Sequence, residues 1–210
     1  MIIRVLHDAL MPLRCVFCGA RSIPPERYIC CDCRAELTAV ESPPPSPSSP
    51  FVDDVAPLAW AFPLDAAIKA LKFRRKLWYA PALAELLCEA SDRLSDDIDA
   101  VLPVPLHWRR RAFRGFNQAE EIARPVARHL GVPLVHNVKR RKATTFQSGL
   151  SARQRSRNLR EAFVVRGALP YAHVLIIDDV VTTGVTMRQV AAALRRAGVG
   201  RLSALAVARA

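Results

Sequence analysis

The sequence predicts an α/β domain with parallel strands, preceded by a small cysteine-rich segment. Val174 to Ile177 is a run of large apolar residues, as expected for a strand buried on both faces of a parallel sheet. An acidic pair, a Thr- and Gly-bearing loop and a helical apolar pattern over Met187–Ala197 follow, and Gly198 stops that pattern. Strand, loop and helix together form half of a βαβ unit, which is typical of α/β folds. Leu202–Val207 is expected to close the sheet as its last strand.

The cysteines are concentrated near the N-terminus. Five of the six fall between Cys15 and Cys33. The pairs Cys15-x2-Cys18 and Cys30-x2-Cys33 have the spacing of a structural zinc site, in which four thiolates hold the metal tetrahedrally. We therefore expect one Zn²⁺ on these four residues, with Cys31 as an alternative to Cys30. A disulfide framework is the rival interpretation, but it requires an oxidising compartment.

A Pro/Ser run over residues 42–50 cannot form a helix or a sheet ladder, so it predicts an extended linker. It divides the chain into a cysteine domain at 1–41 and a larger domain at 51–210. In the first part of the larger domain, the apolar pattern predicts one strand and two helices. These are Val55–Phe62, Leu64–Phe73 and Pro81–Ala90.

A second strand end lies in the middle of the chain. The short apolar run Ala100–Leu102 stops at Pro103 and Pro105, which hold the backbone out of a helix. A helix is expected from Gln118 to Leu130. Between these elements the chain is rich in basic residues, namely His107, Arg109, Arg110, Arg111 and Arg114. Guanidinium groups bind phosphate oxygens bidentately, so this strand end suits a pyrophosphate. A solvated basic loop is the alternative.

A longer basic segment follows over residues 139–160 and contains no acidic residue. Its cations are Lys139, Arg140, Arg141, Lys142, Arg153, Arg155, Arg157 and Arg160. Such a segment suits a hood that closes over a bound polyphosphate, or a track for single-stranded nucleic acid. A solvated charged face is the third interpretation.

The acidic pair and the loop after it predict a ligand. The loop offers backbone N–H groups at a helix N-terminus, hydroxyl donors and a glycine, which together suit a phosphate. Asp178 and Asp179 would repel a phosphate alone. They fit a ligand that also presents vicinal hydroxyl groups, and ribose 5-phosphate has both features. The simpler alternative is that Asp179 caps a helix and the loop is only a turn.

The composition and the hydropathy of the chain limit its partners and its cellular location. The 210 residues carry a formal net charge of +12, which comes mainly from arginine. This charge reflects either a general bias toward arginine or a polyanionic partner. No apolar run approaches the roughly 18 residues of a membrane span, and the start of the chain is a poor secretory signal. We expect no membrane insertion and a cytoplasmic location.

Several motifs occur in a recognisable order along the chain. After the two cysteine pairs they are Ala70-Leu71-Lys72-Phe73, Pro103-Val104-Pro105-Leu106, Arg114-Gly115-Phe116-Asn117-Gln118-Ala119, Gln147, Arg157-Asn158 and Asp178-Asp179-x2-Thr182-Thr183-Gly184. This series resembles the ComF family of competence-associated proteins, in which a zinc ribbon precedes a type I phosphoribosyltransferase domain. The Arg-Gly-Phe-Asn-Gln element is the most specific part of the resemblance.

The resemblance implies a mostly parallel central sheet with flanking helices and Mg²⁺-phosphoribosyl pyrophosphate as ligand. It implies that Asp178 and Asp179 are the catalytic acids that hold the ribose hydroxyl groups. The pyrophosphate would lie at Val104 and Pro105, with Arg114 nearby. The residues implied for the 5′-phosphate loop are Thr182, Thr183, Gly184, Val185 and Thr186.

Two functions follow from this set of residues. The first is a phosphoribosyltransferase that acts on an unidentified, nitrogen-bearing acceptor and is linked to DNA uptake in competence. The second is a single-stranded-DNA-binding competence factor in which the phosphoribosyl site is regulatory or non-catalytic. A zinc-ribbon adaptor that docks other competence proteins is a third reading, and the linker allows it.

Overall fold

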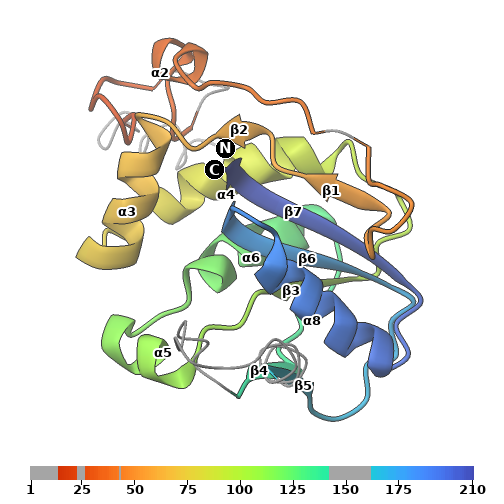
Figure 1. The fold of residues 1–210 in the computed structure, drawn as a ribbon. Coiled ribbons are helices and arrows are strands. Elements are labelled where there is room, and N and C mark those ends of the chain that lie inside the picture. The colour runs from red at the N-terminus through yellow and green to blue at the C-terminus, as the bar shows by residue number, and fades with distance from the viewer. Residues whose placement is uncertain (1–13, 23–26, 43, 142–161) are drawn as a thin grey trace, which may run out of the picture.

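The computed structural model describes residues 14–22, 27–42, 44–141 and 162–210 (Figure 1). A sheet of five parallel strands lies at its centre, in the order β1-β7-β6-β3, and β2 pairs with β7 beyond the end of β1. The strands are β1 (Asp53–Val55), β2 (Leu58–Ala59), β3 (Ala100–Pro103), β6 (His173–Val181) and β7 (Arg201–Arg209). The predicted parallel sheet is therefore confirmed.

The strands differ from the expected ones at their ends. The predicted strand over Val55–Phe62 is two short strands, because Pro57 between them has no N–H to donate to a ladder. β6 does not stop at the acidic pair as expected. Asp178 pairs with Ala206 and Val180 pairs with Ala208, so the ladder to β7 includes the acids and continues beyond them.

Helices cover both faces of the sheet. Figure 1 shows α4 (Tyr79–Ser91) and α6 (Gln118–His129) on one face and α8 (Val185–Arg196) on the other. α3 (Leu64–Arg74) packs beside α4. In the part of the chain that the structure describes, no helix has the length and apolar character to cross a bilayer.

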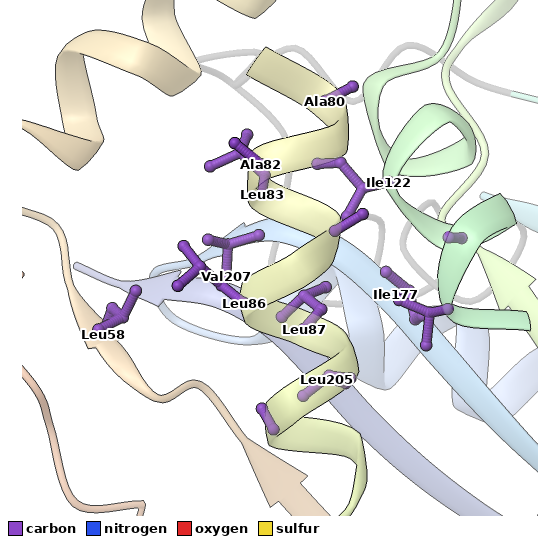
Figure 2. Packing of buried hydrophobic residues seen from close by; sticks show 14 of the residues in the cluster. Leu58, Ala80, Ala82, Leu83, Leu86, Leu87, Ile122, Ile177, Leu205 and Val207 are labelled. Atoms are coloured by element: carbon purple, nitrogen blue, oxygen red, sulfur yellow. The ribbon is translucent and has the colours of Figure 1, made fainter. Parts of the chain in front are cut away.

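The alternation of side chains along β6 explains these two layers. Leu175 and Ile177 belong to the apolar cluster with α4 and α6, while Val174 and Ile176 belong to the cluster with α8. Figure 2 shows the first cluster close up, with α4 lying over β7. Its labelled members include Leu83, Leu86, Leu87, Ile122, Ile177, Leu205 and Val207.

A two-stranded antiparallel ribbon stands apart from the main sheet. It consists of β4 (Val138–Arg140) and β5 (Phe163–Val165), and buried Val138 and Phe163 attach it to the α8 cluster. The ribbon holds the two ends of the basic segment together. The remainder of that segment, from Lys142 through Arg160, lies outside the described residues, so its role as a hood or track stays a prediction.

The cysteine-rich segment packs directly on the larger domain. Arg34 of α2 (Cys31–Ala35) forms ion pairs with Glu85 at 2.6 Å and with Glu89 at 2.7 Å, both on α4. The Phe17 and Tyr79 rings lie 6.4 Å apart. Residues 38–42 then run antiparallel to β2, bridged from Ala39 to Leu58. The two parts therefore share one apolar core.

Candidate functional site

The acidic pair lies near the carboxyl end of β6, and strand alternation directs its two side chains to opposite faces of the sheet. Asp179 is 3% exposed and its Oδ2 lies 2.6 Å from Nζ of Lys72, which comes from α3. Asp178 is half-buried on the other side. Burial raises the pKa of Asp178 well above its usual value, and the neighbouring charge of Asp179 adds to this effect. The two acids therefore have different partners.

The predicted phosphate loop leads directly into α8. The helix begins at Val185 and not at Met187 as expected, and Gly184 occupies its N-cap with a φ of 68°. The first backbone bond of the helix runs from the N–H of Arg188 to the carbonyl of Gly184. The N–H groups of Val185, Thr186 and Met187 precede that bond, so they are available to an anion.

Arg188 lies across this loop. Its guanidinium donates to the carbonyl oxygen of Thr183 at 2.5 Å. A Cβ placed on Gly184 would lie 2.7 Å from Nη1 of Arg188, so the glycine gives the guanidinium room to lie against the backbone. The loop therefore combines free N–H groups, exposed Thr182 and Thr183, and a cation held by a local contact.

The end of β3 lies beside β6. The N–H of Val104 donates to the carbonyl of Ile177 at 2.8 Å. The Asn117 side chain, which is buried, donates from Nδ2 to the carbonyl of Val104 at 3.1 Å. The Arg-Gly-Phe-Asn-Gln element thereby fixes the backbone at Val104 and Pro105. Arg114 donates to Oε1 of Gln118 at 2.9 Å within the same element.

Cations surround the acidic pair. Burial lowers the pKa of Arg114, and the charge of Asp179 acts in the opposite direction, so this guanidinium lies within electrostatic reach of the acid. Arg140 of β4 has a pKa lowered by burial and by Arg110, with Asp178 opposing. Arg114 therefore interacts electrostatically with Asp179, and Arg140 interacts with Asp178. Carboxylates suit the hydroxyl groups of a ligand and guanidinium groups suit its phosphates.

Sequence reasoning did not assign a role to Lys72 and did not predict the helix that ends at Arg114. Lys72 occurs in the Ala-Leu-Lys-Phe motif, and this position is the signal in the sequence that points to it. The basic stretch after Pro105 forms α5 (Trp108–Arg114), a seven-residue helix, and not a loop. His107 caps it by accepting from the N–H of Arg109 at 3.4 Å.

The four predicted cysteines come together in space. Their Sγ atoms all lie within 4.8 Å of one another, and Cys18 and Cys30 are 3.7 Å apart. Sulfur atoms bound tetrahedrally to one Zn²⁺ are separated by about 3.8 Å, so the group fits this metal. Cys31 is exposed and outside the group. The sixth cysteine, Cys88, is half-buried in α4, where burial raises its pKa to about 11.

The chain is similar to known proteins. Residues 117–209 match the family model described as a phosphoribosyl transferase domain. The chain is 38% identical to Competence protein F of Haemophilus influenzae over 157 residues, which cover 70% of this chain and 69% of that protein. It is 35% identical to DNA utilization protein YhgH of Escherichia coli K12 over 198 residues, or 88% of this chain and 85% of that protein.

Among solved structures, the glutamine phosphoribosylpyrophosphate amidotransferase of B. subtilis matches with a TM-score of 0.49 at 18% identity, covering 67% of this chain and 30% of that one. These two relatives decide the assignment, because each is more than 30% identical and more than two thirds of its length is covered. The chain belongs to the ComF family of competence-associated proteins, with an N-terminal cysteine cluster and a type I phosphoribosyltransferase fold.

Proposed function

We propose that the carboxyl edge of the sheet binds Mg²⁺-phosphoribosyl pyrophosphate and that the protein transfers the phosphoribosyl group to a nitrogen acceptor during the use of imported DNA. The main support is the position of Asp178 and Asp179, a few residues before the free N–H groups at the start of α8. The names of the relatives support the link to DNA.

Each part of the ligand has a matching group. The N–H groups of Val185 and Thr186, with the hydroxyl groups of Thr182 and Thr183, hold the 5′-phosphate. The Asp178 carboxylate accepts from a ribose hydroxyl. The backbone at Val104 and Pro105 faces the pyrophosphate, where the Arg114 and Arg140 guanidinium groups offset its charge.

These residues also explain how the reaction proceeds. When the bond from the ribose to pyrophosphate breaks, positive charge grows on the sugar and negative charge on the leaving group. Asp178 stabilises the positive charge on the sugar, and Arg114 and Arg140 stabilise the negative charge on the pyrophosphate. The carboxylates of the site and the pyrophosphate are oxygen ligands that would hold Mg²⁺, which would supply positive charge to offset the negative charge of the leaving group.

Calorimetric titration with Mg²⁺-phosphoribosyl pyrophosphate tests binding. The parent should release or absorb heat on titration, and Asp178→Asn should bind at least about 10-fold more weakly, since a charge-assisted hydrogen bond is lost. Asp65→Asn is the matched control, because Asp65 pairs with Lys69 on α3 and takes no part in the site. A parent that gives no heat rejects the proposal. If the ligand binds but no pyrophosphate is released in the presence of a panel of nucleobases and amines, the transfer reaction is rejected and the binding proposal stands.

We also propose that Cys15, Cys18, Cys30 and Cys33 bind one structural Zn²⁺, in a cytoplasmic protein whose thiols stay reduced. The mutual distances of the four Sγ atoms support this proposal. Elemental analysis should find one zinc per chain in the parent and in Cys31→Ser. Zinc should be absent from Cys15→Ser. A parent without zinc after purification free of chelators would reject the site.

A further inference from the structure

A histidine and a serine are buried near the amino edge of the sheet, at the end of β6 opposite to the acidic pair. His173 begins β6 and is 1% exposed, and Ser203 of β7 is completely buried. Neither residue belongs to the phosphoribosyl site. A buried polar group without a partner costs free energy, so these two side chains depend on their hydrogen bonds.

Three contacts join these side chains to two carboxyl groups in a single row. Nδ1 of His173 lies 2.9 Å from Oδ1 of Asp97, which comes just before β3. Nε2 of His173 lies 2.8 Å from Oγ of Ser203. That hydroxyl group donates to Oδ2 of Asp53 on β1 at 2.7 Å. The four residues, which we call the polar row, therefore link β1, β7, β6 and the chain between α4 and β3.

The donors at the Asp53 end decide where the hydrogen atoms of the row lie. Oδ2 of Asp53 also accepts from the hydroxyl group of Ser95 at 2.9 Å and from its backbone N–H at 3.4 Å. An oxygen with three donors around it suits a carboxylate that carries no proton on that oxygen. Ser203 has a single hydroxyl hydrogen, and it is used on Asp53. The contact between Ser203 and His173 therefore requires a hydrogen atom on Nε2.

The other ring nitrogen carries a hydrogen atom as well. Asp97 forms an ion pair with Arg201, and the hydrogen bond from His173 is the main cause that lowers the pKa of this carboxyl group. An ionised carboxylate only accepts, so the contact requires a hydrogen atom on Nδ1. The surrounding charges favour the same state. Asp99 accepts from the backbone N–H of His173 at 3.2 Å, so it adds a third carboxyl group to those of Asp53 and Asp97.

We propose that His173 is a buried imidazolium, with a proton on each nitrogen, and that it acts as a pH-sensitive clamp on the amino edge of the sheet. Loss of either proton would leave two accepting atoms facing each other in the protein interior, which is costly. The unfolded chain lacks this constraint and releases the proton as pH rises through about 6.5. At higher pH the folded state therefore holds one proton more than the unfolded state, so the stability falls as pH rises. The proposal does not rest on the phosphoribosyl function.

NMR of the full chain, with nitrogen-15 in its histidine side chains, tests the charge of the ring. The His173 signal, assigned through its own backbone signals, should be that of an imidazolium at about pH 8. Exposed imidazole groups are neutral at this pH. His129 and His136 give the comparison within the same sample, because their side chains are 42% and 52% exposed. A neutral His173 ring at this pH would overturn the proposal.

Denaturant unfolding across pH tests the clamp. In the parent, the equilibrium constant of unfolding should rise by up to about 10-fold per pH unit above about pH 7, the limit for one released proton. Ser203→Ala removes the hydroxyl group that requires a hydrogen atom on Nε2, so on a logarithmic scale its rise should be at most about half as steep.

Ser91→Ala is the matched control for this variant. Ser91 is 3% exposed, and its hydroxyl group donates to the carbonyl oxygen of Cys88 within α4, away from the polar row. The control should lose stability but keep the pH dependence of the parent. Equal pH dependence in Ser203→Ala and in the parent would overturn the proposal. If Ser203→Ala does not fold, the NMR result on the parent decides.

Discussion

Lys72 and Asp179 show how strongly one contact can matter at the site. Their side chains are 18% and 4% exposed, and Nζ lies 2.6 Å from Oδ2. Lys72→Met removes the ion-pair partner and leaves the Asp179 carboxylate buried without it. We expect a loss of about 3 kcal/mol in the free energy of unfolding, as is typical when one member of a buried ion pair is removed. Urea unfolding at neutral pH measures it.

Two further variants make this result specific. Lys72→Met together with Asp179→Asn should recover most of the lost stability, because no unpaired charge remains. Lys69→Met is the surface control. It removes a lysine from the same helix, but that lysine is 55% exposed and pairs with Asp65 one turn away. Its cost should stay below about 1 kcal/mol. Equal costs for Lys69→Met and Lys72→Met would contradict the buried pair.

The raised pKa of Asp178 has a consequence for stability in the absence of ligand. Since burial disfavours the carboxylate in the folded protein, the folded state loses stability as pH rises from the ordinary Asp value toward the raised one. Asp178→Asn removes that cost. The variant should therefore be more stable than the parent at about pH 7, and the difference should shrink as pH falls toward about 4. Denaturant titrations of the parent and the variant across this pH range measure the difference in the free energy of unfolding. A variant less stable than the parent at neutral pH would show that the acid is stabilised where it lies.

At the scale of elements, the junction of the phosphate loop with α8 depends on Gly184. Its φ of 68° is in the left-handed region, and a Cβ would meet the Arg188 guanidinium. Gly184→Ala should cost about 1 kcal/mol in stability and should also weaken binding of the phosphoribosyl ligand. Gly131→Ala is the matched control. Gly131 has a φ of 70° and open space around it, and it follows α6 far from the loop. It should lose similar stability with unchanged ligand binding, measured by calorimetry.

The elements differ in how well the sequence predicts them. β6 and α8 were predictable, because four apolar residues in a row and a clear helical pattern arise from local chemistry. The end of β6 was not, because Asp178 and Asp179 are poor strand residues in isolation and are held there by the ladder to β7. α5 was missed for a related reason. It buries no side chain, so its sequence has no apolar stripe, and its contact with Arg75 joins residues that are far apart in the sequence.

The pairing of Lys72 with Asp179 could not be predicted from the sequence, for another reason. The two residues come from α3 and β6, which are far apart in the sequence, and the pairing requires knowledge of how α3 packs beside the sheet. The spacing of the cysteines, in contrast, favours Cys30 over Cys31, and Cys30 is the one that lies in the cluster. Short-range geometry between ligands is encoded by residue spacing, while the contacts that link different layers of the fold are not.

At the scale of the whole molecule, the cysteine segment and the larger domain are joined more closely than a Pro/Ser linker suggests. Cys15, Cys30 and Cys33 are buried in the same apolar cluster as α4 and β7. Backbone bonds from Val40 to Pro57 at 2.8 Å and from Ala59 to Thr38 at 2.9 Å add the segment to the edge of the sheet. Unfolding of one part should therefore expose the core of the other.

This shared core predicts one cooperative thermal transition with metal bound and a large effect of metal removal on all of it. Chelation, or Cys15→Ser, should lower the midpoint by about 10 °C, because the loss of metal binding is a loss of folding free energy. Scanning calorimetry should show the whole transition moving, and not a small separate peak disappearing. Cys31→Ser, which alters a neighbouring thiol outside the group, should leave the midpoint unchanged.

Arg34→Ala should reduce the coupling between the unfolding of the cysteine segment and that of the larger domain, since Arg34 joins α2 to Glu85 and Glu89. A midpoint for the larger domain that stays constant after the zinc is removed would mean that the two parts fold independently.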